Sequence, residues 1–155
     1  MAGKRVLAFD FGASSGRAIL ASYEDGKISM QEIHRFSNDP VTVCGVFHWD
    51  VLRLFFEIKQ GITKAVHQGG FDAIGIDTWG VDFGLLDKKG RLLNNPVHYR
   101  DERTVGMIEK VFETIPAQEL YGRTGIQFAR LNTLFQLAAL RQDEPETLAQ
   151  AETLL

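Results

Sequence analysis

The chain has 155 residues, of which 45% are hydrophobic and 24% are charged. This length and composition are typical of a soluble protein with one well-buried domain. The net charge of −3 argues against nucleic acid or an anionic membrane as a partner, and no stretch approaches the roughly 20 apolar residues of a membrane span. The only cysteine, Cys44, excludes a disulfide within the chain and favours the cytoplasm. A lone cysteine among valines is more often a small hydrophobe than a nucleophile.

The first predicted strand covers residues 6–9 and ends on Asp10. Its uninterrupted apolar run is typical of a strand buried on both faces, where a terminal carboxylate needs a charged partner. Five of the next six residues are Gly, Ala or Ser, so a ligand can approach the backbone N–H groups closely. With the Ser14 and Ser15 hydroxyls and the Arg17 guanidinium, this turn favours a metal-bound polyphosphate. An ordinary β-hairpin explains the same residues almost as well.

An antiparallel meander is predicted for the rest of the N-terminal region. A second strand covers residues 18–23 and a third covers residues 28–36, joined by a turn with Asp25-Gly26 at its centre. Residues 37–45 are expected to form a loop, because they contain Asn38-Asp39-Pro40.

A helix and a parallel strand are predicted next. The helix begins after its N-cap, Asp50, and ends at Gly69-Gly70. A further apolar strand over residues 73–77 ends on Asp77, and a right-handed crossover would place it parallel to the first strand. Asp10 and Asp77 would then lie at one sheet edge, where open α/β sheets bind ligands. Helical spacing predicts a single buried helix face, formed by Val51, Phe55, Ile58, Ile62, Ala65 and Val66.

The remaining residues are predicted to be mostly helical, after a fifth strand over residues 83–87. Helices are expected over residues 105–115 and 131–141, with a shorter one from Pro116 to Leu120 and a last one from Pro145. The chain ends on an apolar run, whereas a natural terminus is usually polar and loose. We therefore expect the chain to be the N-terminal fragment of a longer protein.

Five stretches of the chain resemble one family of enzymes. Residues 10–17, Asp-Phe-Gly-Ala-Ser-Ser-Gly-Arg, resemble the phosphate-loop hairpin of the actin-like ATPase and sugar-kinase superfamily. Residues 75–83, Gly-Ile-Asp-Thr-Trp-Gly-Val-Asp-Phe, resemble the sugar-side loop of the FGGY carbohydrate kinases. The other matching stretches, in the same order as in that family, are residues 32–36, residues 96–101 with Arg103, and residues 125–128 followed by 132–134.

The resemblance implies a fold and an activity. The fold is a ribonuclease-H-like α/β domain, with a mixed five-stranded sheet that contains the three-stranded meander and has flanking helices. Residues 1–155 would be the N-terminal kinase domain, incomplete at its C-terminal end, and the nucleotide-side domain would be absent. The implied activity is ATP-dependent phosphorylation of L-rhamnulose to L-rhamnulose 1-phosphate, in L-rhamnose breakdown.

The resemblance also implies site residues. Asp10 would face Mg²⁺ through water, and the sugar would meet Gly80, Asp82 and Tyr99. The family's catalytic Asp lies downstream of residue 155, so no catalytic residue is assigned within the chain. The ATP phosphates would be lined by Ala13, Ser14, Ser15, Gly16 and Arg17.

Several side chains have two interpretations on sequence alone. Asp77 or Asp82 could act as the general base, but orienting the sugar or ending a strand is favoured. Trp79 could stack on the sugar, and a core position is nearly as common. The cluster of Arg100, Asp101 and Arg103 could hold a substrate loop or simply be an exposed charge cluster. The four histidines lack metal-ligand spacing and are predicted to serve packing or the surface.

Two other classes of function are compatible with parts of the sequence. A metal-dependent nuclease would converge Asp10 and Asp77 on two metals, but the acidic balance argues against a nucleic-acid groove. A non-catalytic module could use the sugar loop alone.

Overall fold

A four-stranded sheet and one long helix form the first of two units in the chain. The computed structural model describes residues 3–155. The first unit comprises the residues up to Pro40 together with Asp50–Gly80, and the second comprises Val41–Trp49 together with Val81–Leu155. Among the described residues, no helix is long and apolar enough to cross a membrane.

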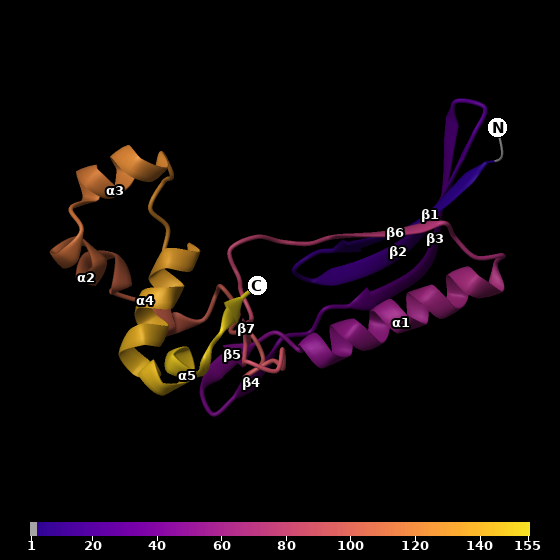
Figure 1. Cartoon of the computed structure of the whole chain (residues 1–155). Helices are drawn as coiled ribbons and strands as arrows, with labels where there is room; N and C mark the ends of the chain where they lie inside the picture. The colour runs from indigo at the N-terminus through magenta and orange to yellow at the C-terminus, as the bar shows by residue number, and fades with distance from the viewer. Residues whose placement is uncertain (1–2) are drawn as a thin grey trace. The chain divides into compact units, whose positions relative to one another are not determined.

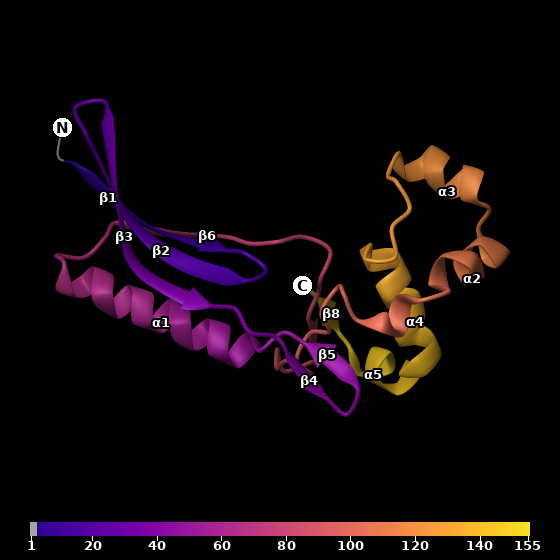
Figure 2. The same cartoon turned by 180° about the vertical axis from the view of Figure 1, so that it is seen from behind.

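The sheet of the first unit has the order β3-β2-β1-β6. Strands β1 (Lys4–Phe11), β2 (Ser15–Glu24) and β3 (Lys27–Ser37) form the predicted antiparallel meander (Figures 1 and 2). Strand β6 (Ala73–Asp77) pairs with β1 in parallel, with Asp10 opposite Asp77. The predicted parallel pairing is therefore confirmed, and the two carboxylates lie at the same edge.

Helix α1 (Val51–His67) packs on one face of this sheet (Figure 1). The side chain of Asp50 accepts a hydrogen bond from Arg53 N at 3.0 Å, so the predicted N-cap is confirmed. The predicted buried face is confirmed in part: Ile58, Ile62 and Ala65 lie against the core, whereas Phe55 and Val66 are each 57% exposed. At Gly61 an added Cβ would lie 2.7 Å from the ring of Phe9, so the helix approaches the sheet most closely there. Positions related to Gly61 by helical spacing therefore face the sheet: they are Leu54, Ile58 and Ala65. The neighbouring Ile62 packs against the same cluster.

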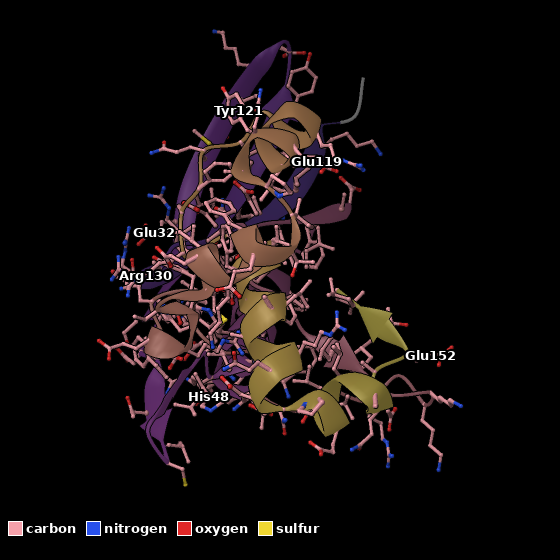
Figure 3. All side chains as sticks on the ribbon, turned by 90° about the vertical axis from the view of Figure 1, so that its left-hand side faces the viewer. Glu32, His48, Glu119, Tyr121, Arg130 and Glu152 are labelled. Atoms are coloured by element: carbon pink, nitrogen blue, oxygen red, sulfur yellow. The ribbon has the colours of Figure 1, made fainter. Side chains whose placement is uncertain are left out.

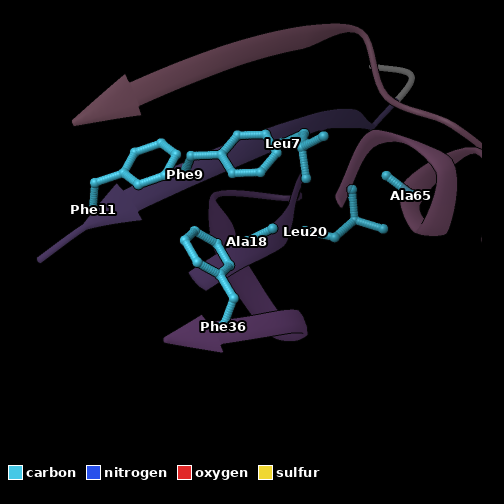
Figure 4. Close-up of a cluster of buried hydrophobic side chains, with 7 residues drawn as sticks. All are labelled: Leu7, Phe9, Phe11, Ala18, Leu20, Phe36 and Ala65. Carbon is cyan, nitrogen blue, oxygen red and sulfur yellow. The ribbon is translucent and has the colours of Figure 1, made fainter. Parts of the chain in front are cut away.

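The core of the first unit lies between α1 and the sheet. On β1 the burial alternates: Leu7 and Phe9 are buried, whereas Val6 is 37% exposed. The expectation that residues 6–9 are buried on both faces is wrong, because the helix covers only one face of the strand. Figure 4 shows the buried cluster, which consists of Leu7, Phe9, Phe11, Ala18, Leu20, Phe36 and Ala65.

Two short strand pairs belong to the second unit. Strands β4 (Val41–Val43) and β5 (Val46–His48) form a hairpin. Residues 37–45 were expected to form a loop, so β4 is a strand that the sequence did not predict. The hairpin turn holds Cys44 at a φ of 51°, and the thiol side chain is exposed rather than buried as a small hydrophobe. Strand β7 (Leu85–Leu86) pairs with β8 (Thr153–Leu154) in a separate sheet.

The prediction of a fifth strand in the main sheet is therefore wrong. The extended residues are only Leu85 and Leu86, and their partner is at the end of the chain. The reason is a backbone turn between β6 and β7, where Val81 takes a φ of 71°. Such a φ takes Val81 out of the β region and marks a turn, and the strand that follows it pairs with β8 instead of β6.

The helices of the second unit follow the predicted order. A 3₁₀ turn, η1 (Glu102–Thr104), precedes α2 (Met107–Thr114), and Pro116 separates α2 from α3 (Ala117–Thr124). Helix α4 (Thr133–Asp143) follows, and Pro145 opens α5 (Pro145–Gln150). The second core is formed by Met107, Leu120, Phe135 and Ala139.

Candidate functional site

The turn between β1 and β2 is held in shape by a buried asparagine. Asn38 is 4% exposed, and its Nδ2 donates to Gly12 O at 3.0 Å. Its backbone N donates to Ser14 O at 3.0 Å, and Gly12 N donates to Ser15 O at 2.9 Å. The turn is thus ordered by contacts within the protein itself. Sequence reasoning treated Asn38 only as a loop marker, because its partners are more than twenty positions earlier in the chain.

Asp10 and Arg17 form an ion pair beside this turn. Arg17 Nε and Nη2 both donate to Asp10 Oδ2, at 2.9 and 2.8 Å, across the antiparallel register of β1 and β2. Both side chains are about half exposed. The buried-strand argument expected a charged partner for Asp10, and Arg17 is that partner.

A second ion pair continues the charged surface onto β3. Arg35 lies opposite Arg17 in the strand register and donates to Glu32 through Nε and Nη2. The hydrogen bonds from Arg35 lower the pKa of Glu32, and Glu32 raises the pKa of Arg35. Glu32 is labelled in Figure 3. The strands around the turn thus carry two guanidinium groups, each already paired with a carboxylate.

Gly16 has a packing role that the sequence did not indicate. A Cβ at this position would lie 2.2 Å from Cζ of Phe36, whose ring belongs to the buried core. The missing side chain is therefore required by the core, whatever ligand the turn binds. Around it, Ser14, Ser15 and Arg17 are exposed and Ala13 is half-buried.

At the neighbouring strand end, Asp77 caps the backbone. Its Oδ1 accepts a hydrogen bond from Thr78 N at 3.1 Å, which agrees with the strand-ending role favoured on sequence. Trp79 packs against the core of the first unit, so its core interpretation is supported. Within residues 3–155, the structure contains no group of three or more His, Cys, Asp or Glu side chains that could hold a metal ion.

Gly80 and Asp82 follow β6. A Cβ on Gly80 would meet nothing within 4 Å, so packing among the described residues does not require a glycine there. Asp82 is firmly held: Trp49 Nε1 donates to its Oδ2 at 2.6 Å, and Gln136 Nε2 donates to its Oδ1 at 3.0 Å.

An aromatic stack holds Trp49, which donates a hydrogen bond to Asp82. Trp49 is 1% exposed and lies parallel to the His98 ring, with 3.9 Å between ring centroids. Tyr99 lies beside both, with ring centroids 4.5 Å from His98 and 6.1 Å from Trp49. Burial lowers the pKa of His98, and Arg100 N donates to its Nδ1 at 3.0 Å. The structure therefore groups Asp82 and Tyr99 around Trp49 and His98.

The charged stretch after Tyr99 is not an exposed cluster. Asp101 is buried, and its carboxylate accepts hydrogen bonds from Phe47 N and Arg103 N, at 2.8 and 2.9 Å. Burial lowers the pKa of Arg103, whose Nη2 donates to Gln136 Oε1 at 3.0 Å. Arg100 remains near the surface, with its guanidinium 5.3 Å from the centroid of the Tyr99 ring. Asp101 and Arg103 thus belong to the hydrogen-bonded cluster around Asp82, and of the three charged residues only Arg100 is exposed.

Sequence reasoning missed Trp49, His98 and Gln136 as parts of this cluster. Trp49 lies 33 positions and Gln136 lies 54 positions from Asp82. The local signals were weak: Trp49 is a large aromatic residue just before the helix cap Asp50, and Gln136 is an amide within a helix. Neither pattern is specific for a binding site.

A parallel strand pair, crossover helix and antiparallel meander, with carboxylates at the strand ends, define an α/β fold of the ribonuclease-H type. Residues 5–155 match the FGGY family of carbohydrate kinases, N-terminal domain. The chain belongs to this family.

Curated relatives include several rhamnulokinases. The chain is 48% identical to the one from Klebsiella pneumoniae (strain 342) over 151 residues, which are 96% of this chain and 31% of that protein. It is 46% identical to the one from Bacteroides thetaiotaomicron over 150 residues, again 96% of this chain and 31% of that protein. The chain therefore spans about a third of the length of these relatives.

Solved structures of sugar kinases share the fold. A gluconate kinase from Lactobacillus acidophilus matches with a TM-score of 0.83 and 18% identity, over 99% of this chain and 31% of that one. A ligand-bound xylulose kinase from the same organism matches with a TM-score of 0.81 and 19% identity, over 97% and 31% of the two chains. The predicted fold class is thus confirmed.

Proposed function

We propose that the protein containing this chain phosphorylates L-rhamnulose with ATP to L-rhamnulose 1-phosphate, in L-rhamnose breakdown. The observation that carries this proposal is the 48% identity to a rhamnulokinase over 96% of the chain. We further propose that residues 1–155 are its N-terminal domain and that a nucleotide-side domain follows. The cytoplasm, which supplies ATP and keeps Cys44 reduced, is the proposed compartment.

The turn after β1 is proposed to bind the ATP phosphates. Its exposed backbone and the Ser14 and Ser15 hydroxyls offer hydrogen-bond donors, and Arg17 offers a guanidinium. Arg17 contacts Asp10 through Nε and Nη2 only, so its Nη1 can donate to phosphate. The residues that would line the phosphates are Ala13, Ser14, Ser15, Gly16 and Arg17.

Asp10 is proposed to face Mg²⁺ through a water molecule. Its Oδ2 already accepts from Arg17, so a water-mediated contact fits better than direct ligation, which would compete with the ion pair. Bound Mg²⁺ would neutralise phosphate charge during phosphoryl transfer. Asp10 would then orient one of the waters that Mg²⁺ usually retains.

Gly80, Asp82 and Tyr99 are proposed to bind the ketose. Asp82 would accept hydrogen bonds from sugar hydroxyls, and Gly80 would leave room for the sugar. Because Trp49 and Gln136 already donate to the two oxygens of Asp82, this carboxylate suits an orienting role. We therefore propose no catalytic residue within the chain, and place the base downstream of residue 155.

A coupled ADP-release assay on the complete kinase tests this function. We expect kcat/KM to be higher for L-rhamnulose than for D-xylulose or for gluconate, the substrates that the names of the structural neighbours suggest as alternatives. Higher kcat/KM with either alternative, or no ADP release with L-rhamnulose, would overturn the proposal.

A further inference from the structure

We propose that Gln136 is a positioning residue for the ketose: it fixes the bend at Val81 and the rotation of the Asp82 carboxylate. This inference rests on the proposed function, in which Asp82 contacts the sugar. Gln136 itself lies on α4 and is 1% exposed, so it acts through Asp82 rather than on the substrate.

The orientation of the Gln136 amide is determined by its neighbours. Arg103 Nη2 can only donate, so the atom 3.0 Å from it must be the amide oxygen, Oε1. The amide nitrogen then faces three acceptors: Leu131 O at 2.9 Å, Asp82 Oδ1 at 3.0 Å and Val81 O at 3.2 Å. If the amide were flipped, its nitrogen would face the Arg103 guanidinium, donor against donor. Its oxygen would face three acceptor oxygens. The side chain therefore has one permitted orientation.

Val81 is the strained residue that this amide helps to hold. Its φ of 71° is unfavourable for a β-branched residue, and it lies between the proposed sugar contacts Gly80 and Asp82. The Val81 carbonyl accepts from Thr133 Oγ1 at 2.7 Å as well as from Gln136 Nε2. Two donors from the first turns of α4 thus hold the backbone in a conformation that it would otherwise leave. Strain of this kind is concentrated at functional sites.

Gln136 and Trp49 together set the rotation of the Asp82 carboxylate. Trp49 Nε1 donates to Oδ2, and Gln136 Nε2 donates to Oδ1. Trp49 is held by its stack on His98, and Gln136 is held by Arg103. With a donor fixed on each oxygen, the plane of the Asp82 carboxylate has a defined rotation, which orients it for hydrogen bonds from a ketose with several hydroxyls.

The decisive variant is Gln136→Glu, made in the complete kinase. The substitution keeps the shape but replaces the donor to Asp82 with a second carboxylate, so the two repel each other near neutral pH. We expect KM for L-rhamnulose to rise roughly tenfold to a hundredfold, as for a lost hydrogen bond to a charged group, while KM for ATP stays unchanged.

A pH series separates positioning from packing. In acid the carboxylate pair shares a proton, so the introduced group can donate to Asp82 again. The charged or titratable groups around this pair are Arg103 and His98, and around these two lie Arg100, Asp101, Asp143 and Glu144; wild-type enzyme carries the same set. We expect the ratio of variant to wild-type KM for the ketose to fall as the pH is lowered from 8 to 5. A ratio that stays constant would show a merely structural role and overturn the proposal.

Two further variants keep the test decisive. Gln142→Glu makes the same change at an exposed position of α4 and should leave both KM values unchanged. Thr133→Val removes one donor from the Val81 carbonyl at nearly constant volume, and should raise the KM for L-rhamnulose but not that for ATP. If Gln136→Glu fails to fold, an unchanged ketose KM in Thr133→Val contradicts the inference. If wild-type enzyme does not phosphorylate L-rhamnulose, the proposed function fails instead, which the same assay reports separately.

Discussion

At the scale of single residues, the structure separates glycines that serve packing from glycines, Gly80 among them, that are free of it. Gly16 lies against Phe36, and Gly61 lies against Phe9, so both are small because the core leaves no room. Gly80 has open space around its Cβ position and no left-handed φ is recorded for it. Gly75 and Gly122 share both properties, so the proposed sugar contact at position 80 needs a direct test.

The first prediction concerns Gly80→Leu in the complete kinase. Nothing among the described residues lies within 4 Å of the position that a Cβ would take, so we expect the fold to persist. If the sugar occupies that space, KM for L-rhamnulose should rise far more than KM for ATP in steady-state assays. Equal effects on both would indicate that the loop is structural.

A second prediction contrasts Gly16 with Gly75. Gly16→Ala adds a Cβ against the Phe36 ring, and overpacking of this kind typically costs about 1–3 kcal/mol of the free energy of unfolding. Gly75→Ala adds the same group to β6 where nothing lies within 4 Å, so it should be neutral or slightly stabilising. Urea unfolding measures both. Similar stabilities for the two variants would show that the core around Phe36 adapts.

At the scale of elements, a buried polar bridge joins β3 to α1. His34 Nε2 donates to Glu57 Oε2 at 2.6 Å, and Arg53 Nε donates to Glu57 Oε1 at 2.5 Å. Lys64 Nζ donates to His34 Nδ1 at 2.8 Å. Burial by itself raises the pKa of Glu57, but the hydrogen bonds from His34 and Arg53 lower it overall. The bridge therefore favours the ionised carboxylate.

The third prediction follows from the sign of that shift. A folded-state pKa below the ordinary value of 4.5 means that ionised Glu57 stabilises the fold above that pH, and that the stabilisation is lost as the pH falls through the folded pKa. Glu57→Gln should lower the free energy of unfolding by about 1–3 kcal/mol at pH 7. The difference from wild type should shrink below pH 4.5 in a series of urea titrations.

Glu32→Gln is the matched control for that experiment. It removes an exposed carboxylate from β3, the strand that also carries His34, and exposed ion pairs contribute little. A loss of stability as large as that of Glu57→Gln would contradict the importance given to burial.

At the scale of the whole molecule, the chain spans about a third of the length of its rhamnulokinase relatives, and our proposal places the base and the nucleotide-side domain downstream of residue 155. The turn beside Asp10 is open to solvent, so phosphate contacts there compete with water. A general base typically contributes about 10²–10⁴-fold to the rate. Domain closure contributes further by excluding water and aligning the reacting groups.

The fourth prediction is that residues 1–155 alone do not transfer phosphate from ATP to L-rhamnulose. The coupled ADP-release assay on the purified chain should show no turnover above the no-sugar control. Steady turnover that disappears on Asp82→Asn would place the base within this chain, and would contradict its proposed position downstream of residue 155.

Much of the first unit was predictable because its signals are local. The Asp25-Gly26 turn, the Asp50 cap and the paired glycines after α1 each act on neighbouring backbone, and all three are confirmed. The two strands that end on aspartate needed only the crossover rule to bring Asp10 beside Asp77. The assigned ligand roles of these residues stay predictions.

The sequence by itself determined the order of the elements, the family and the carboxylates at the strand ends, because periodicity, turn residues and motifs are properties of short segments. Only the tertiary structure decided which face of α1 is buried, that Leu85 and Leu86 leave the main sheet, and that Gln136 and Trp49 meet at Asp82. These outcomes depend on contacts between segments far apart in the chain. The close approach of Gly61 to Phe9 and the positive φ of Val81 are likewise not encoded in the spacing of nearby residues.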